Sequence, residues 1–459
     1  MQIRKKTKRV NLPKKVSLWL LLGPAFIWAS TAQGGGELIW WPYLVARYGK
    51  AFLFLLLPFA LMQFFVNKEI TKYTAVTGKG IWSGFLSVNK YYTLFLFILF
   101  FVNFLWFGGY ATAGGSSLYE IFKWPGGGNS RFGSLFWAYI MVILFSLALL
   151  FSRSVYRLLE KMMKVITVIT VGGLLLSVVI LINKASVWRF VDGLFNPMNL
   201  GKGVDWLNFD YSKLITALVF AGMGGFLNLM YSYWMQEKGV AMAQKDKTGL
   251  MIKDNEVNKS RWLFWNRYLR IDSGLAVLIN AVTIILTSFL SFVLLWPKGE
   301  YPVGWSITVA QSAFFETSFG WWGRVIFLIV AAAFLVDTWL ALADGVANQM
   351  ADFFYGWLDK WKIFKTRKAW YYGWLSFLII ESMLTMPMVG PGILIQLVGV
   401  ISMFAFVAYI PLLWYLNYVQ LPKKYPIFIK SSKLSEVCLW VVWGIYTLLA
   451  GWYVYSLLR

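Results

Sequence analysis

The chain has 459 residues, of which 59% are hydrophobic and 14% are charged, and its formal net charge is +23. A soluble globular domain contains about 25% charged residues, so a chain this apolar could not keep its surface in water, and a bilayer is its natural solvent. There is no histidine and one cysteine, Cys438. These counts exclude internal disulfides, histidine-based catalytic triads and HExxH zinc sites. The sequence also lacks GxxxxGK[ST] and GxGxxG motifs, which argues against a soluble-type enzyme and an ATP-driven pump.

Apolar stretches of about 20 residues, the length needed to cross a bilayer, recur along the whole chain. Turn-forming residues separate them at 124–128, 296–299 and 421–424. A basic start leads into the first stretch, which continues to Trp41 without a clear cleavage site, so we expect it to be a retained helix. The predicted spans are 17–47, 50–71, 91–119, 132–152, 162–183, 212–238, 270–296, 321–356, 369–388, 391–418 and 435–457.

Lys and Arg are distributed unequally between the two sides of these spans, with a roughly threefold excess on the side of the N-terminus. This bias predicts a cytoplasmic N-terminus and an outside C-terminus, which requires an odd number of spans. We therefore expect an all-α, multi-pass protein of the cell membrane, with one transmembrane domain over 1–459. The positive charge then reflects topology and contact with anionic lipid, and does not indicate nucleic-acid binding.

Two predicted spans contain glycine runs that a simple membrane helix would avoid. Residues 33–37 read QGGGE in the first span, and residues 222–228 read GMGGFLN in the sixth. Each glycine costs a helix about 1 kcal/mol relative to alanine. Interruptions at corresponding places in two halves of a chain indicate a transporter binding site, because unwound backbone frees groups that can hold an ion. The alternative is that the glycines allow helices to pack closely.

This pairing predicts two inverted repeats of five spans, about 17–183 and 212–418, followed by an extra helix at about 435–457. Helices 1 and 6 would be the broken ones, since each opens a repeat. About eleven transmembrane helices are expected in total.

Glu37 is the principal candidate for a binding residue, because an ionisable group beside freed backbone at mid-membrane is a functional site by default. A carboxylate with carbonyl oxygens suits Mg²⁺, Mn²⁺ or a monovalent cation. Asp337 and Asp344 lie on one helical face, where they could form a proton or Na⁺ path or pair with Arg324 or a neighbouring helix. Gln396 could ligate substrate or join two helices by a hydrogen bond.

These residues resemble the Nramp family of divalent-metal transporters, within the amino acid–polyamine–organocation superfamily. The resemblance is carried by Gly23-Pro24 at the start of the first span, by residues 73–79 (YTAVTGK), which are similar to the family's G-x-V-T-G-K loop, by 345–350 (GVANQM), and by Gln396 with the downstream 410–412 (IPL). It implies a LeuT-like fold with a substrate site between helices 1 and 6.

By position, the resemblance implies that the site includes Glu37 as a metal ligand and the backbone carbonyls of Thr31 and Gly222. The full set of candidate substrate or ion-binding residues is Thr31, Gly34, Glu37, Gly222, Gly225, Asn228 and Gln396. The family's metal-binding Asp and Asn positions are Gly34 and Glu37 here, and its Met-Pro-His is replaced by 225–227 (GFL). The family's soft thioether ligand is therefore missing.

We expect a secondary transporter, not an enzyme, that moves a cation by alternating access, with a divalent metal ion as the main substrate. Its partners would be that ion or a small molecule and the bilayer, and no cofactor is implied beyond the transported ion. The alternative is a LeuT-fold transporter of a small organic solute such as an amino acid, which the roomy glycine runs and the missing metal ligands favour.

Overall fold

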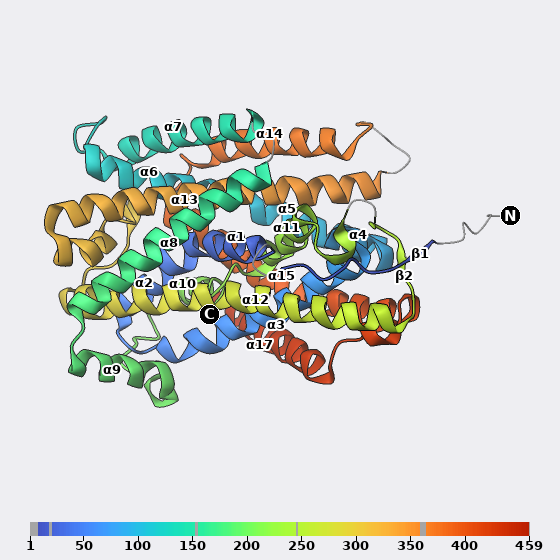
Figure 1. Ribbon diagram of the computed structural model, residues 1–459. Helices are drawn as coiled ribbons and strands as arrows, with labels where there is room; N and C mark the ends of the chain where they lie inside the picture. Colours follow the sequence, from blue (N-terminus) through green and yellow to red (C-terminus); the bar gives the residue numbers. More distant parts are fainter. Residues whose placement is uncertain (1–7, 18–20, 152–154, 245–246, 359–363, 459) are drawn as a thin grey trace.

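The computed structural model describes residues 8–17, 21–151, 155–244, 247–358 and 364–458. These residues form a bundle of long helices (Figure 1). The only sheet within the described ranges is a two-stranded parallel ribbon of β1 (Arg9–Val10) and β2 (Met251–Ile252).

The helices in chain order are α1 (Gly23–Ala32), the π-helix η2 (Gln33–Trp40), α2 (Trp41–Tyr48), α3 (Leu56–Thr77), α4 (Ile81–Val88), α5 (Lys90–Asn103), α6 (Gly108–Phe122), α7 (Ser130–Phe151), α8 (Val155–Leu181), α9 (Lys184–Phe195), α10 (Tyr211–Val219), the 3₁₀ segment η6 (Gly225–Met230), α11 (Tyr231–Lys238), α12 (Glu256–Leu290), the π-helix η8 (Ser291–Leu295), α13 (Ala313–Trp357), α14 (Arg367–Thr385), α15 (Pro391–Trp414), the π-helix η12 (Tyr415–Gln420), α16 (Leu421–Lys424) and α17 (Lys433–Leu457). Short 3₁₀ turns fill several connections: η3 (Leu53–Leu55), η4 (Phe104–Trp106), η5 (Pro197–Asn199), η7 (Ala241–Ala243), η9 (Trp296–Lys298), η10 (Gly304–Ser306), η11 (Ala310–Ser312) and η13 (Ile427–Ile429).

Eight helical stretches within the described residues are long and apolar enough to cross a membrane. They are Leu53–Thr77, Lys90–Phe122, Ser130–Leu147, Met163–Leu181, Glu256–Lys298, Gly304–Trp357, Pro391–Lys424 and Lys433–Leu457. Each overlaps one predicted span, although the fifth and sixth stretches begin 14 and 17 residues before the predicted starts at 270 and 321. The other three predicted spans, 17–47, 212–238 and 369–388, are also largely helical; two of them carry the glycine runs, and the third carries the charged residue Glu381. The chain is therefore a multi-pass helical membrane protein, and the total of eleven spans stays a prediction.

The first helix begins at Gly23 instead of residue 17, because residues 8–17 run as an extended strap along the start of α12. Leu12 in this strap is fully buried. Its N–H donates to Asn258 Oδ1 (2.8 Å), its carbonyl accepts a hydrogen bond from Arg261, and the Trp265 indole donates to the Pro13 carbonyl (3.3 Å). The strap thus fixes where α1 enters the bundle.

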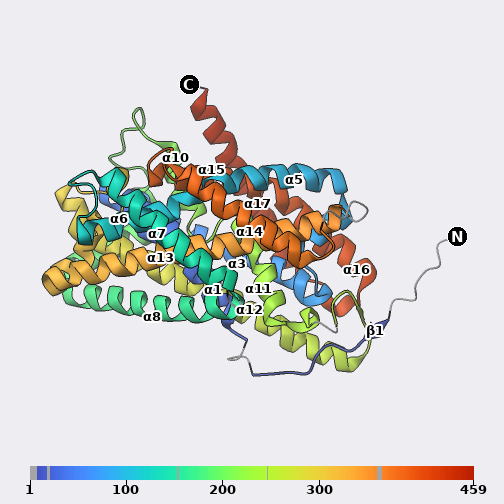
Figure 2. The same ribbon diagram turned by 90° about the horizontal axis from the view of Figure 1, so that it is seen from above.

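The helices that carry the glycine runs lie in the interior of the bundle. α1 packs against α8, α12 and α13, and α11 packs against α3 (Figure 1). The outermost layers are formed by α7 and α14, which lie side by side, and by α17, which packs on α3 and α15 (Figures 1 and 2). Exposed apolar side chains on α7, α8 and α17, such as Leu144, Val168 and Leu448, face outward as lipid contacts would require. The fold therefore shields the two interrupted segments from lipid on all sides.

Candidate functional site

The first glycine run is wound as a π-helix, so the chain stays helical from Gly23 to Tyr48. π-Helical turns are rare, and many occur at functional sites. Each glycine in the run meets a neighbouring helix: Gly34 faces Thr338 of α13, Gly35 faces Tyr110 of α6, and Gly36 lies against the Phe220 carbonyl at the end of α10. Helix 1 is therefore not unwound, as was expected, but changes from α-helix to π-helix at the glycine run. The contacts of the three glycines hold this π-helical segment in place.

The second glycine run breaks its helix, as expected. α10 ends at Val219, and the chain leaves the helical conformation through Phe220–Gly224 before η6 and α11. Gly224 and Gly225 have φ angles of 76° and 47°, which an L-residue rarely adopts. A Cβ at Gly225 would also collide with Ser402 of α15. Both the backbone conformation and the close packing therefore require glycine here.

The two interruptions touch each other, and side chains of the protein bind the carbonyls around them. The Ala221 carbonyl accepts from Asn280 Nδ2 of α12 (3.0 Å), and the Val219 carbonyl accepts from Gln63 Nε2 of α3 (3.4 Å). The Thr31 carbonyl, one of the predicted cation ligands, accepts from Thr338 Oγ1 (3.4 Å). Donors of the protein thus occupy these carbonyls in this conformation.

Glu37 lies beside this contact and is fully buried. Neither carboxylate oxygen has a hydrogen-bond partner among the described residues, and no ion pair involving Glu37 is found there. Burying an unpaired charge is so costly that such a group is normally neutral or bound to a counter-charge. Glu37 therefore requires a proton or a bound cation.

Three amide side chains, on the two interrupted helices and on α12, have one orientation in common: their N–H₂ groups are bonded and their oxygens are free. Asn228 Nδ2 donates to Gln63 (2.7 Å), Gln33 Nε2 donates to Thr283 (3.0 Å), and Asn280 Nδ2 donates to Ala221. Several buried acceptor oxygens have no donor in the described structure, and they include Glu37 Oε1 and Oε2, Gln33 Oε1, Asn228 Oδ1 and Asn280 Oδ1. The Tyr409 hydroxyl is a polar neighbour of Asn228 but forms no hydrogen bond of normal geometry with it. The site is thus rich in acceptors, which suits a cation.

Two of the predicted site residues, Gly222 and Asn228, share the Gln63 side chain as a neighbour. Gly222 packs against Gln63 and Trp28, and Asn228 binds the same Gln63 side chain. Gln396 lines a pocket of about 160 Å³ together with Trp40 at the end of η2, Tyr43 and Lys213.

The two aspartates of α13 have different surroundings. Asp337 is buried beside Ser30 of α1 but forms no hydrogen bond of normal geometry within the described structure. Asp344 accepts hydrogen bonds from the Tyr371 hydroxyl (2.7 Å) and from Asn348 Nδ2 (3.3 Å). Pairing with Arg324 is not found, since that residue binds Glu120 and Glu316 (2.8 Å each).

No group of three or more acidic or cysteine side chains that could hold a metal ion occurs within the described ranges. A cation at the interrupted helices would therefore be held by one carboxylate and by neutral oxygens. Sequence reasoning missed Gln63, Asn280 and Thr338, which organise the contact. Their signal was a polar residue within an apolar span, but nothing in the sequence showed which backbone groups they would bind.

No family model and no curated protein matches this sequence. Among solved structures, the fold is similar to that of the Eremococcus coleocola manganese transporter in complex with an aromatic bis-isothiourea compound, with a TM-score of 0.65 and 14% identity over 98% of this chain and 89% of that chain. A mutant of that transporter gives a TM-score of 0.64 at 14% identity, over 97% of this chain and 89% of that chain. MhsT bound to L-phenylalanine gives a TM-score of 0.50 at 14% identity, over 96% of this chain and 100% of that chain. These likenesses confirm the LeuT-like fold that was expected from the sequence.

Proposed function

We propose that this protein is a secondary transporter that moves a cation, chiefly a divalent metal ion, across the cell membrane by alternating access. The observation that carries the proposal is the fully buried Glu37 carboxylate on the first interrupted helix, whose two oxygens have no donor in the described structure, together with unbonded amide oxygens on the interrupted helices and α12. Hard divalent cations take oxygen ligands from carboxylates, amides and backbone carbonyls. The similarity to a manganese transporter supports the same assignment.

Each candidate residue has its own proposed role in binding the cation. Glu37 supplies the negative charge, and Asn228 supplies an amide oxygen. Thr31 and Gly222 contribute backbone carbonyls once the helices move apart, because the Thr31 carbonyl is bonded to Thr338 in the conformation described here. Gly34 and Gly225 keep the neighbouring helices close enough to form the site.

Asp337 and Asp344 are proposed to carry the coupling ion, a proton or Na⁺, along one face of α13. Asp337 lies at the level of α1, beside Ser30. Asp344 accepts a hydrogen bond from Asn348, and the Arg367 guanidinium donates to Asn348 Oδ1 (3.2 Å). Arg367 also lines a cavity of about 470 Å³. With the N-terminus in the cytoplasm, as the charge distribution predicts, this cavity opens to the cytoplasm.

A small organic solute is the second candidate, and the pocket around Gln396 favours it. The Trp40 indole N–H is buried there without an acceptor in the described structure, and Lys213 supplies a second donor. The Lys213 ammonium also pairs with Asp210 (3.1 Å), so the unused donor is the indole; an apolar pocket with such a donor suits a solute that has an apolar body and a carboxylate or carbonyl oxygen.

Uptake into proteoliposomes distinguishes the two candidates. The panel is Mn²⁺, Mg²⁺, Fe²⁺ and pooled amino acids, each with and without a proton or Na⁺ gradient, with protein-free liposomes as the control. We expect gradient-stimulated uptake of at least one divalent metal. Uptake of an amino acid without any metal uptake would replace the first candidate with the second.

A further inference from the structure

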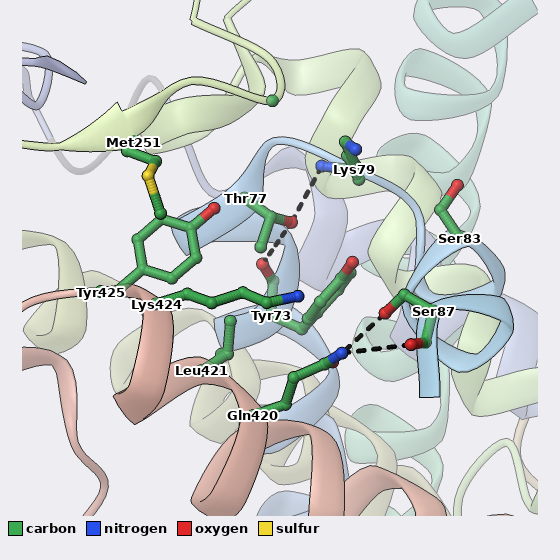
Figure 3. Close-up of a pocket in the computed structure, with 11 residues that line it drawn as sticks. Tyr73, Thr77, Lys79, Ser83, Ser87, Met251, Gln420, Leu421, Lys424 and Tyr425 are labelled. Atoms are coloured by element: carbon green, nitrogen blue, oxygen red, sulfur yellow. Dashed lines mark hydrogen bonds between the residues drawn. The ribbon is translucent and has the colours of Figure 1, made fainter. Parts of the chain in front are cut away.

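A pocket of about 200 Å³ lies at the end of α3, on a different part of the chain from the glycine runs (Figure 3). Its walls come from α3, from α4, from the segment that includes β2, and from η12 and α16. Lys424 reaches across the pocket toward Tyr73, and Lys79 lies on the opposite side (Figure 3). The pocket thus brings together segments from both repeats and from the connection to the last helix.

The unused polar groups of this pocket are all hydrogen-bond donors. Lys79 and Lys424 have no ion pair or hydrogen bond through their ammonium groups within the described part of the chain. Tyr73 is only 5% exposed, and its hydroxyl forms no hydrogen bond of normal geometry there. Its polar neighbour Thr77 is already engaged, since Thr77 Oγ1 donates to the Tyr73 carbonyl (2.9 Å) and accepts from the Lys79 N–H (3.1 Å). The Tyr425 hydroxyl is likewise unbonded among described residues.

The acceptors near the pocket are already used, and no carboxylate lines it. Asp352 is an acidic residue that interacts electrostatically with Tyr73. Its carboxylate already accepts hydrogen bonds from the Ser83 hydroxyl (3.1 Å) and the Tyr233 hydroxyl (2.8 Å). The Gln420 amide donates to the Ser87 carbonyl (3.2 Å), as Figure 3 shows. Two ammonium groups and two phenol hydroxyls therefore face the cavity without a counter-charge.

We propose that this pocket binds a phosphate group. A phosphate carries negative charge and several strong acceptor oxygens, so it complements lysine ammonium and tyrosine hydroxyl donors. The volume of about 200 Å³ is smaller than the roughly 300–1,000 Å³ of pockets for drug-sized ligands, which fits a phosphate and its nearest substituent. The apolar span of α3 ends at Thr77, so the pocket lies where an anionic lipid headgroup and a soluble phosphate compound can both reach it.

Thermal unfolding of the purified full-length protein tests the proposal, because a ligand that binds only the folded state raises the midpoint of unfolding. One arm titrates inorganic phosphate against sodium chloride at matched ionic strength. The other compares reconstitution in phosphatidylglycerol–phosphatidylcholine vesicles with phosphatidylcholine vesicles. We expect stabilisation in at least one arm: stabilisation by inorganic phosphate identifies a soluble phosphate compound as the ligand, and stabilisation by phosphatidylglycerol alone identifies a lipid headgroup.

The double variant Lys79→Gln/Lys424→Gln should lose the stabilisation, with an affinity at least tenfold weaker. The matched control is Lys423→Gln/Lys430→Gln, which removes the same charge from lysines outside the pocket. If the pocket variant does not fold, Tyr73→Phe and Tyr425→Phe keep the charge and should each weaken binding several-fold. The proposal is overturned if neither arm stabilises the wild type, or if the pocket variants respond as the control does.

Discussion

Replacing Gly36 with alanine tests whether the two interruptions are held in contact by close packing. A Cβ at this position would collide with the Phe220 carbonyl oxygen, which belongs to rigid backbone at the break in helix 6. Overpacking of this kind typically costs about 1–3 kcal/mol. It outweighs the gain of roughly 0.5–1 kcal/mol that alanine normally brings to a helix in place of glycine. We therefore expect Gly36→Ala to lower the free energy of unfolding by about 1–2 kcal/mol.

The matched control is Gly444→Ala in α17, where an added Cβ would meet no heavy atom within 4 Å. Both variants are purified in the same detergent, and their thermal unfolding is compared with that of the wild type. Gly444→Ala should be as stable as the wild type or more stable, and Gly36→Ala clearly less stable. If the two variants unfold at the same temperature, the contact between Gly36 and Phe220 does not constrain the fold and the reasoning fails.

Two further predictions concern polar contacts. Asn228→Leu leaves the buried Gln63 oxygen without its 2.7 Å hydrogen bond. A double-mutant cycle with Gln63→Leu should therefore give a coupling energy of about 0.6 kcal/mol, the average for hydrogen bonds within membranes. A coupling energy of zero would contradict the hydrogen bond between Asn228 and Gln63. At the chain surface, donation from Lys50 and two neighbouring asparagines holds the pKa of Asp192 well below its usual range. This interaction stabilises the protein above the unfolded pKa of about 3.9 and is lost as the pH falls through the lower folded pKa. Asp192→Asn should therefore unfold at a lower temperature than the wild type at pH 7, and that difference should shrink as the pH falls below about 4; a difference that is independent of pH would refute the linkage.

The two interruptions could be predicted because they violate local rules. Glycine runs and a carboxylate in the middle of apolar spans are unfavourable unless the site needs them, and the break at Phe220–Gly224 lies where the sequence indicated it. The π-helical form of the first interruption could not be predicted, since it depends on contacts of Gly34 with Thr338 and of Gly36 with Phe220, which come from distant parts of the chain.

The side chains that form hydrogen bonds at the site could not be predicted from the sequence either. Gln63 and Asn280 are visible in the sequence as polar residues within predicted spans, but their roles depend on which carbonyls the fold brings to them. Gln396 was expected at the substrate site, and it lines a pocket that also includes Trp40 at the end of η2. Lys79 was used only as part of the 73–79 motif and Lys424 only as topological charge, because no local pattern shows that the two residues converge.

Metal uptake by Glu37→Gln proteoliposomes tests the central claim most directly. The matched control is Glu381→Gln in α14, because Glu381 is also buried with both carboxylate oxygens unbonded among the described residues, but it lies outside the interrupted helices. Mn²⁺ uptake is measured for both variants at equal protein density, with folding checked by size-exclusion chromatography. The account predicts that uptake is lost in Glu37→Gln and retained in Glu381→Gln. Full uptake by a folded Glu37→Gln protein would contradict it.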